Sequence, residues 1–303
     1  MKCRKRNAVR QKGKTLNFWK AITFRWSREE LKSWTTIRRT AYILLPLLFY
    51  YVAHDIAQVL LWGMTEFMIQ RGGERVLAFA EKYADTLRAV ISALAILAGM
   101  AVIRGAAKGE ISFRDKTVET GKERTTAYLL LMVLSFGLSM GINILFYQIG
   151  FTGSSEGFER VYKQQYGVVF FIGLILYGVI SPLAEEMVFR GLIYNRMKRC
   201  FSLPVAIVVS SLLFGCYHGN PVQAVYGFLM GLAIAWSYEG FGSFAAPVWF
   251  HAVANISVYA LTYQNALAAM SRQGALAAGI GALTAAGLIA GYLHKNYFVT
   301  VHG

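Results

Sequence analysis

Long apolar runs dominate this chain. About eight of them can be marked along the sequence, covering roughly residues 41–64, 87–104, 126–150, 166–184, 203–218, 221–239, 244–262 and 274–293. A helix needs about 20 mainly apolar residues to cross the ~30 Å hydrocarbon core of a bilayer. Only 16% of the residues are charged, whereas soluble domains carry about 25%. The sequence therefore predicts an all-α protein, a polytopic transmembrane helical bundle of about eight spans.

The positive charge of the chain predicts how the bundle is oriented. The formal net charge is +15, and 13 of the 31 Lys and Arg residues lie within residues 1–40. With that basic arm in the cytoplasm, 24 cations fall on the inner side of an eight-span bundle and seven on the outer side. This bias is what the positive-inside rule expects. We therefore expect both termini in the cytoplasm of a multi-pass cell-membrane protein, with the arm against an anionic leaflet of the lipid bilayer. No DNA-binding motif accompanies the charge, so no nucleic-acid partner is expected.

A few ionisable side chains lie inside or at the ends of the apolar runs. A charge at membrane depth is costly, so each such residue is a candidate for function. Carboxylates, imidazoles and one guanidinium make up the set: His54, Asp55, Glu185, Glu186, Arg190, His218 and His251. Carboxylate and imidazole are the groups of general acid–base and metal chemistry. Because no motif includes His54 and Asp55, we interpret them as an internal pair or as residues of an aqueous cavity.

The spacing of these residues separates the two glutamates. Glu186 and Arg190 are four residues apart, so they can form an ion pair along one helix face. Glu185 lies about 100° around the helix and is free to point elsewhere. We therefore predict that Glu185 is the reactive carboxylate and that the Glu186–Arg190 pair supports it. His251 and Asn255 also share a face, and an amide there can orient the imidazole or stabilise an oxyanion.

Counting residues tests whether these groups can meet. If the chain turns near residues 201–202, Glu185 and His218 are each about 16 residues from the turn, and antiparallel helices would place them at the same depth. His251 is only seven residues into its run, which puts it nearer the cytoplasmic side. By this count His218 and His251 lie at different depths.

Three short motifs occur in order along residues 166–262. They read Glu185-Glu186-Met187-Val188-Phe189-Arg190, then Phe214-Gly215-Cys216-Tyr217-His218, then His251-Ala252-Val253-Ala254-Asn255. This set resembles the CPBP family of intramembrane proteases, also called the CAAX-protease or Abi-like family, which is related to type II CAAX prenyl endopeptidases. The family pattern is EExxxR, FxxxH and HxxxN on separate membrane helices.

The resemblance implies an intramembrane endopeptidase that hydrolyses membrane-associated peptides or proteins. Glu185 would activate a water molecule with help from His218, His251 and Asn255 would stabilise the oxyanion, and Glu186 and Arg190 would hold the site in shape. The family has been described both as metalloproteases and as metal-independent glutamate proteases. The site therefore has either no cofactor or a divalent metal such as zinc, and both alternatives stay open. Glu185, His218 and His251 are the candidate metal ligands. The sequence has no HExxH helix.

Two other classes of function stay open. A catalytically silent relative would act by binding, as a membrane scaffold or immunity protein, and a proton-coupled transporter would use the same groups as a relay. The absence of inverted repeats with broken helices disfavours the transporter. The chain divides into a basic arm (1–40), N-terminal transmembrane helices (41–165), a protease core (166–262) and a C-terminal helix with its tail (263–303).

Two further patterns predict structure rather than chemistry. Gly227 and Gly231 are four residues apart in an apolar run, which is typical of close helix packing. Arg196, Lys198 and Arg199 follow the first motif and are most simply interpreted as a solvated cationic anchor on the cytoplasmic side.

Overall fold

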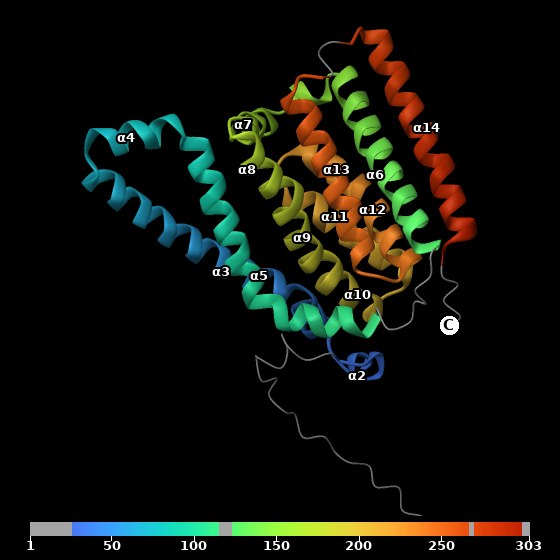
Figure 1. The fold of residues 1–303 in the computed structure, drawn as a ribbon. Helices are drawn as coiled ribbons and strands as arrows, with labels where there is room; N and C mark the ends of the chain where they lie inside the picture. Colours follow the sequence, from blue (N-terminus) through green and yellow to red (C-terminus); the bar gives the residue numbers. More distant parts are fainter. Residues whose placement is uncertain (1–25, 115–122, 267–269, 299–303) are drawn as a thin grey trace, which may run out of the picture.

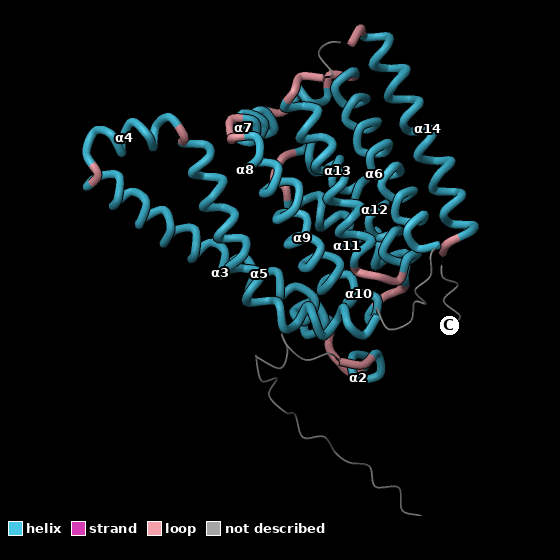
Figure 2. Tube along the Cα trace, in the orientation of Figure 1, coloured by secondary structure: helices cyan, strands magenta, loops and turns pink. Residues whose placement is uncertain are grey.

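The computed structural model describes residues 26–114, 123–266 and 270–298, and within these ranges the chain is helical and contains no strand (Figure 1 and Figure 2). Each of the apolar runs lies in a helix. These helices are α3 (Thr36–Arg71), α5 (Ala84–Arg114), α6 (Glu123–Gln148), the continuous stretch α8–α10 (Phe170–Cys200), α11 (Leu203–Tyr217), α12 (Pro221–Phe241), α13 (Ala245–Tyr263) and α14 (Arg272–Asn296). The all-α prediction is therefore confirmed.

Three shorter helices connect or flank the long ones. They are α2 (Arg28–Lys32), α4 (Gly73–Lys82) and α7 (Glu156–Tyr166), and a 3₁₀ turn precedes α7 at Phe151–Ser154. Among the described residues, α3, α5, α6, α8–α10 and α14 are long and apolar enough to cross a membrane. The chain is a multi-pass integral membrane protein. Eight spans and two cytoplasmic termini remain predictions.

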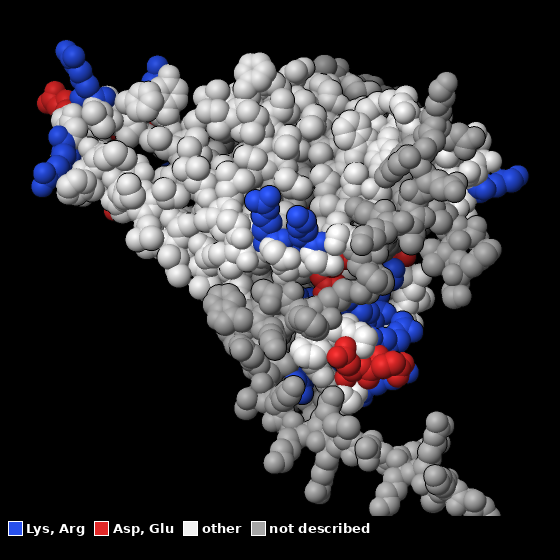
Figure 3. Space-filling model, turned by 60° about the horizontal axis from the view of Figure 1, so that its bottom comes forward, with Lys and Arg blue, Asp and Glu red and all other residues white. Residues whose placement is uncertain are grey.

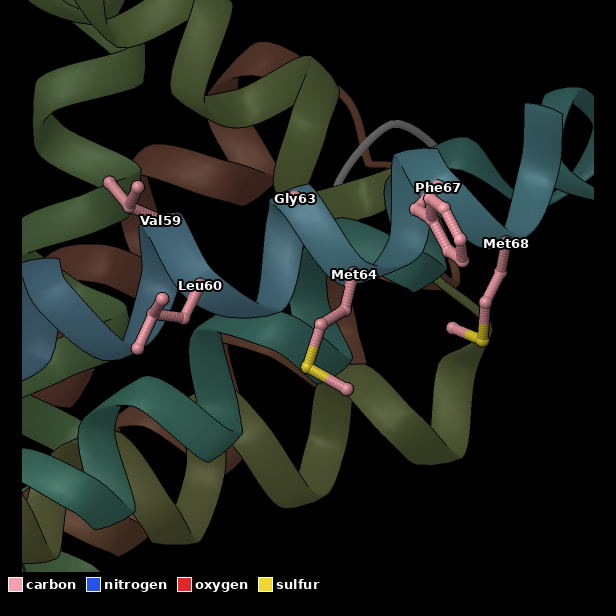
Figure 4. Close-up of a pocket in the computed structure, with 6 residues that line it drawn as sticks. All are labelled: Val59, Leu60, Gly63, Met64, Phe67 and Met68. Carbon is pink, nitrogen blue, oxygen red and sulfur yellow. The ribbon is translucent and has the colours of Figure 1, made fainter.

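The bundle has a packed part and an extended part. Helices α6 and α8–α14 lie side by side, whereas the outer halves of α3 and α5 reach away from them and are joined by α4 (Figure 1). The outer half of α3 carries a shallow apolar groove, lined by Val59, Leu60, Gly63, Met64, Phe67 and Met68 (Figure 4). These side chains suit contact with lipid tails. On the face shown in Figure 3 most of the described surface is uncharged, and Lys, Arg, Asp and Glu side chains form small separate groups on it.

The long helix α8–α10 is not a regular α-helix. It contains two π-helical segments, at Leu176–Ile180 and Met187–Tyr194, with the short α9 (Ser181–Glu186) between them. Pro182 explains the first segment, because a proline ring clashes with the carbonyl four residues earlier in an α-helix. π-Helical turns are rare and occur frequently at functional sites. Here they flank the two motif glutamates on either side.

The end of α10 is held by buried ion pairs rather than by solvent. Arg196 is only 1% exposed, and its Nε lies 3.3 Å from Glu110 Oε1 of α5. The same carboxylate oxygen pairs with Arg199 at 2.6 Å and accepts a hydrogen bond from Tyr42 of α3 at 3.1 Å. Lys198 pairs with a second carboxylate, that of Glu239, at 2.6 Å.

The prediction that Arg196, Lys198 and Arg199 form a solvated anchor is therefore wrong. A guanidinium at the end of a membrane helix can be buried when a carboxylate on a neighbouring helix compensates its charge. Glu110 provides that charge because α5 continues as a helix to Arg114, past the end of its apolar run near residue 104. The network ties α3, α5 and α10 together at the α2 end of the bundle.

Candidate active site

Helix α9 places the two motif glutamates in the interior of the bundle. Glu186 is fully buried, and the Glu185 side chain is 14% exposed. Consecutive residues on a helix point about 100° apart, so the two carboxylates face different neighbours. Glu186 faces Arg190 and His251, whereas Glu185 faces the two motif histidines and a group of tyrosines.

Glu186 and Arg190 form the ion pair that their spacing predicts. Arg190 donates from its guanidinium to Glu186 Oε1 at 3.0 Å, and neither side chain is exposed. A second nitrogen of Arg190 donates to the Gly231 carbonyl of α12 at 3.0 Å. The guanidinium also lies over the Phe214 ring, 4.7 Å from its centroid. The pair therefore binds α9 to both α11 and α12.

His251 of α13 lies between the two carboxylates. Its Nδ1 is 2.8 Å from Glu186 Oε1, and its Nε2 is 3.7 Å from Glu185 Oε2. Because Glu186 is a carboxylate held by Arg190, it accepts the Nδ1–H and fixes the ring plane. Nε2 is thereby turned towards Glu185, whose Oε2 is buried with no hydrogen-bond partner among the described residues.

His218 ends α11 on the other side of Glu185. Its Nδ1–H donates to the Phe214 carbonyl at 2.9 Å, which leaves Nε2 free to act on another group. The charge of the Glu185 carboxylate reaches both imidazoles. Both imidazoles contact the Phe214 ring, so His218 and His251 lie close together, although counting residues along straight helices put them at different depths. The π-helical segments break the regular rise on which that count depends.

Phe214 connects the three motifs. Its ring contacts the imidazoles of His218 and His251 edge-on, with centroids 5.1 Å and 5.5 Å apart. It also packs against Phe189 at 5.2 Å, in addition to lying beneath Arg190. Phe214, one turn before His218, therefore provides the apolar surface against which both imidazoles and the Arg190 guanidinium pack.

Glycines let α11 and α12 approach closely beside the site. A Cβ at Gly215 would lie 2.4 Å from the Ala224 carbonyl oxygen, and one at Gly231 would lie 3.0 Å from Ser211. Gly227 faces Gly215 and the His218 ring. The close packing predicted from the spacing of Gly227 and Gly231 is confirmed, and it is what brings His218 against the rest of the site.

Asn255 has a different partner from the one that its spacing suggests. Its side-chain N–H donates to the Tyr177 carbonyl at 3.0 Å, while His251 is oriented by Glu186. In the π-helical segment the Tyr177 carbonyl would bond to the N–H of residue 182, but that residue is Pro182 and has none. Asn255 supplies the missing donor and so stabilises the irregular turn that precedes α9.

The three candidate metal ligands were tested against this geometry. Both imidazoles donate their Nδ1–H to an acceptor and present Nε2, which is the usual arrangement of histidine ligands. However, the described residues contain no group of three or more His, Cys, Asp or Glu side chains placed to hold a metal ion. Glu185, His218 and His251 do not form a set of metal ligands in this structure. The reaction proposed for the site therefore uses protein groups alone.

Residues outside the motifs also face the site. Tyr50 and Tyr51 of α3, together with Tyr217 of α11, lie within reach of the Glu185 charge. The Tyr51 and Tyr217 rings pack against each other, with centroids 5.7 Å apart. Sequence reasoning missed them because tyrosines in membrane helices usually indicate an interfacial belt, and only Tyr217 lies within a motif.

Comparison with known proteins places the site in a family. Residues 167–257 match the family model described as "Rce1-like: Type II CAAX prenyl endopeptidase Rce1-like". The chain is also 23% identical over 176 residues to a Bacillus subtilis (strain 168) protein named "Putative membrane peptidase YdiL", covering 58% of this chain and 71% of that relative. No solved structure gives a significant match.

The matched residues contain all three motifs and helices α8 to α12 with most of α13. They fall within the predicted core, residues 166–262, whose exact limits stay a prediction. The match and the relative support a membrane protease at the level of the family. Residues 167–257 are therefore similar to the Rce1-like family of type II CAAX prenyl endopeptidases, and this match together with the peptidase relative supports the resemblance to the CPBP, or CAAX protease, family.

Proposed function

We propose that the protein is an intramembrane endopeptidase in which Glu185 activates a water molecule to hydrolyse peptide bonds of membrane-associated peptides or proteins. The observation that carries the proposal is the sequence of contacts Arg190–Glu186–His251–Glu185, which ends at the buried oxygen Glu185 Oε2. A carboxylate oxygen without a protein donor, beside an imidazole nitrogen, is suited to bind and deprotonate water.

The proposed reaction balances with the groups at hand. Glu185 takes one proton from water as the water oxygen attacks the carbonyl carbon of the scissile bond, giving a tetrahedral oxyanion. His251 and Asn255 stabilise that oxyanion. His251 acts as an imidazolium, which donates from Nε2–H while its Nδ1–H stays on Glu186, and Asn255 donates its second amide hydrogen. Glu185 then passes its proton to the leaving nitrogen as the C–N bond breaks. His218, from the other side of Glu185, assists the proton transfers.

Glu186 and Arg190 position the site without touching the reacting atoms. Their pair gives His251 a fixed acceptor on Nδ1, so the imidazole keeps its orientation during the reaction. Asn255 has a double role in this proposal, because its bond to the Tyr177 carbonyl also fixes the turn that precedes the glutamates.

The test uses the full chain in liposomes with a library of membrane-tethered peptides. Cleavage products of wild type, Glu185→Gln and a control, Glu66→Gln, are identified and timed by mass spectrometry. Glu66 is an exposed glutamate on α3, so the control makes the same chemical change away from the site. We expect Glu185→Gln to lose about 10²–10⁴-fold in rate, the usual contribution of a general base, and Glu66→Gln to match wild type.

Two results would contradict the proposal. Undiminished cleavage by Glu185→Gln would show that this carboxylate is not the base. No cleavage of any peptide by wild type, with peptide retained on the protein, would indicate the binding role of a catalytically silent relative.

A further inference from the structure

Helix α3 carries a line of polar side chains through the bundle. Tyr51, His54 and Gln58 follow at spacings of three and four, so they share one helix face. All three are partly buried, whereas the apolar neighbour Val59 is 71% exposed. The apolar face of α3 is therefore turned outwards, and the polar line is turned towards the protein.

The outer end of this line opens into a polar cavity. The cavity has a volume of about 200 Å³, which at about 30 Å³ per molecule is room for several waters. Its polar lining comes from α3, α5, α7 and the first π-helical segment, and consists of Gln58, Asp85, Arg88, Ser92, Gln164 and Tyr177. Asp85 and Arg88 form an ion pair at 2.6 Å. Such a lining holds water readily.

The inner end of the line reaches the active site. The Tyr51 ring packs against Tyr217 with centroids 5.7 Å apart, and the Tyr217 ring in turn contacts the His218 imidazole at 5.5 Å. His54 stacks on Tyr50, with ring centroids 6.1 Å apart. Its Nδ1 is 2.9 Å from Asp55 Oδ1, so Nε2 remains free to bind a water molecule.

The relative positions of α3 and α8–α10 show that the two ends are connected. At the α2 end of the bundle, Tyr42 contacts Arg196. Nine residues further along α3, Tyr51 packs on Tyr217, which contacts Phe189. After seven more residues Gln58 lines the cavity with Tyr177. The helices therefore run antiparallel side by side. From Gln58 to Tyr51 the path covers seven residues, or about 10 Å.

We propose that Tyr51, His54 and Gln58 form a hydrophilic path along α3 that delivers water from the polar cavity to Glu185. A hydrolase consumes one water molecule in each turnover, and lipid around the bundle cannot supply it. The three motifs assign no role to His54 and Asp55. In the proposed path His54 binds water, and Asp55 orients the His54 ring. It rests on the proposed function for the use of the water, but its existence can be measured without any substrate.

Cysteine accessibility measures the path directly. His54→Cys, Gln58→Cys and Ser92→Cys are each placed in the full chain in liposomes and exposed to a small charged thiosulfonate. Mass spectrometry locates the label, so the natural cysteines can stay. Val59→Cys is the matched control, one residue beyond Gln58 on the outward face. We expect the path and cavity cysteines to react about tenfold faster or more than Val59→Cys, because only a thiolate reacts and apolar surroundings keep a thiol protonated.

A second measurement links the path to hydrolysis. His54→Leu and Gln58→Leu should each lower the cleavage rate at least about tenfold, with Val59→Leu as the control, since the water supply limits the reaction. Labelling of Gln58→Cys and Ser92→Cys at the slow rate of Val59→Cys would overturn the path, even if wild type cleaves peptide. Fast labelling with no cleavage by wild type would leave the path standing and contradict the proposed function instead.

Discussion

The buried pair Glu186–Arg190 offers the sharpest test of how the site is held. Arg190 is 0% exposed, and its charge is compensated by one carboxylate oxygen at 3.0 Å. At that distance the attraction is about 5 kcal/mol for an effective dielectric constant of about 20. Replacing Glu186 by Leu leaves the guanidinium with the Gly231 carbonyl and the face of Phe214. We expect Glu186→Leu to lower the free energy of unfolding by about 3–5 kcal/mol, the usual cost of an unpaired buried charge.

Removing the second charge should restore most of that stability. In the double variant Glu186→Leu with Arg190→Met no charge is left unpaired, and buried ion pairs can often be replaced by apolar residues without loss. What remains is the Nδ1–H of His251 without its acceptor, at about 1–3 kcal/mol. The double variant should therefore be about 2 kcal/mol more stable than Glu186→Leu and still be inactive, because His251 is no longer oriented.

The assay is unfolding in mixed detergent micelles, followed by tryptophan fluorescence, with peptide cleavage measured on the same preparations. The reasoning would be refuted if the double variant were no more stable than Glu186→Leu, because the charge of Arg190 would then not be the cause of the loss. Full activity in the double variant would refute the positioning role separately.

Three more outcomes are expected. Peptide cleavage should survive exhaustive treatment with a chelator, because the candidate ligands do not form a set among the described residues; loss that zinc reverses would contradict this. Glu110→Gln should lower the free energy of unfolding by about 3 kcal/mol, since Arg196 is then buried without a carboxylate; an unchanged unfolding midpoint would count against the network. Gly215→Ala should cost about 1–3 kcal/mol by overpacking α11 against α12, whereas Gly281→Ala, with open space around its Cβ position, should be neutral or slightly stabilising; equal effects would argue against close packing.

The sequence predicted those parts of the site that depend on one helix. Spacing along a helix identified the Glu186–Arg190 pair, because residues four apart are neighbours whatever surrounds them. Apolar runs located the long helices, and the turn at residues 201–202 lies between α10 and α11. The motifs brought Glu185, His218 and His251 into one hypothesis, which stays a prediction. In the structure His251 lies 3.7 Å from Glu185, and both imidazoles contact Phe214.

Contacts between helices could not be predicted in the same way. Glu110 lies beyond the apolar run that ends near residue 104, and the sequence does not indicate that the helix continues to it. Its partners Arg196 and Arg199 then looked solvated. Nothing in the sequence indicated that tyrosines of α3 face the site, because hydrophobic periodicity shows which face of a helix is buried but not which helix packs against it. The first π-helical segment is stabilised by the hydrogen bond from Asn255 of α13 to the Tyr177 carbonyl, a contact between helices that no local pattern contains.

The ion pair within α8–α10 has a consequence for how the chain enters the membrane. A charged residue at the centre of a helix costs about 2.5–3.5 kcal/mol during insertion, and this helix carries two glutamates and Arg190 near its middle. Because Glu186 and Arg190 are neighbours on the same helix, their pair can form as soon as the helix does, without a contact from any other span. The pair between Glu110 and Arg196 needs α5 in place, and the contact of Glu186 with His251 needs α13. During biogenesis the helix therefore enters the bilayer with its central charges already partly neutralised, and the reactive groups are completed only when α13 is synthesised and packs against it.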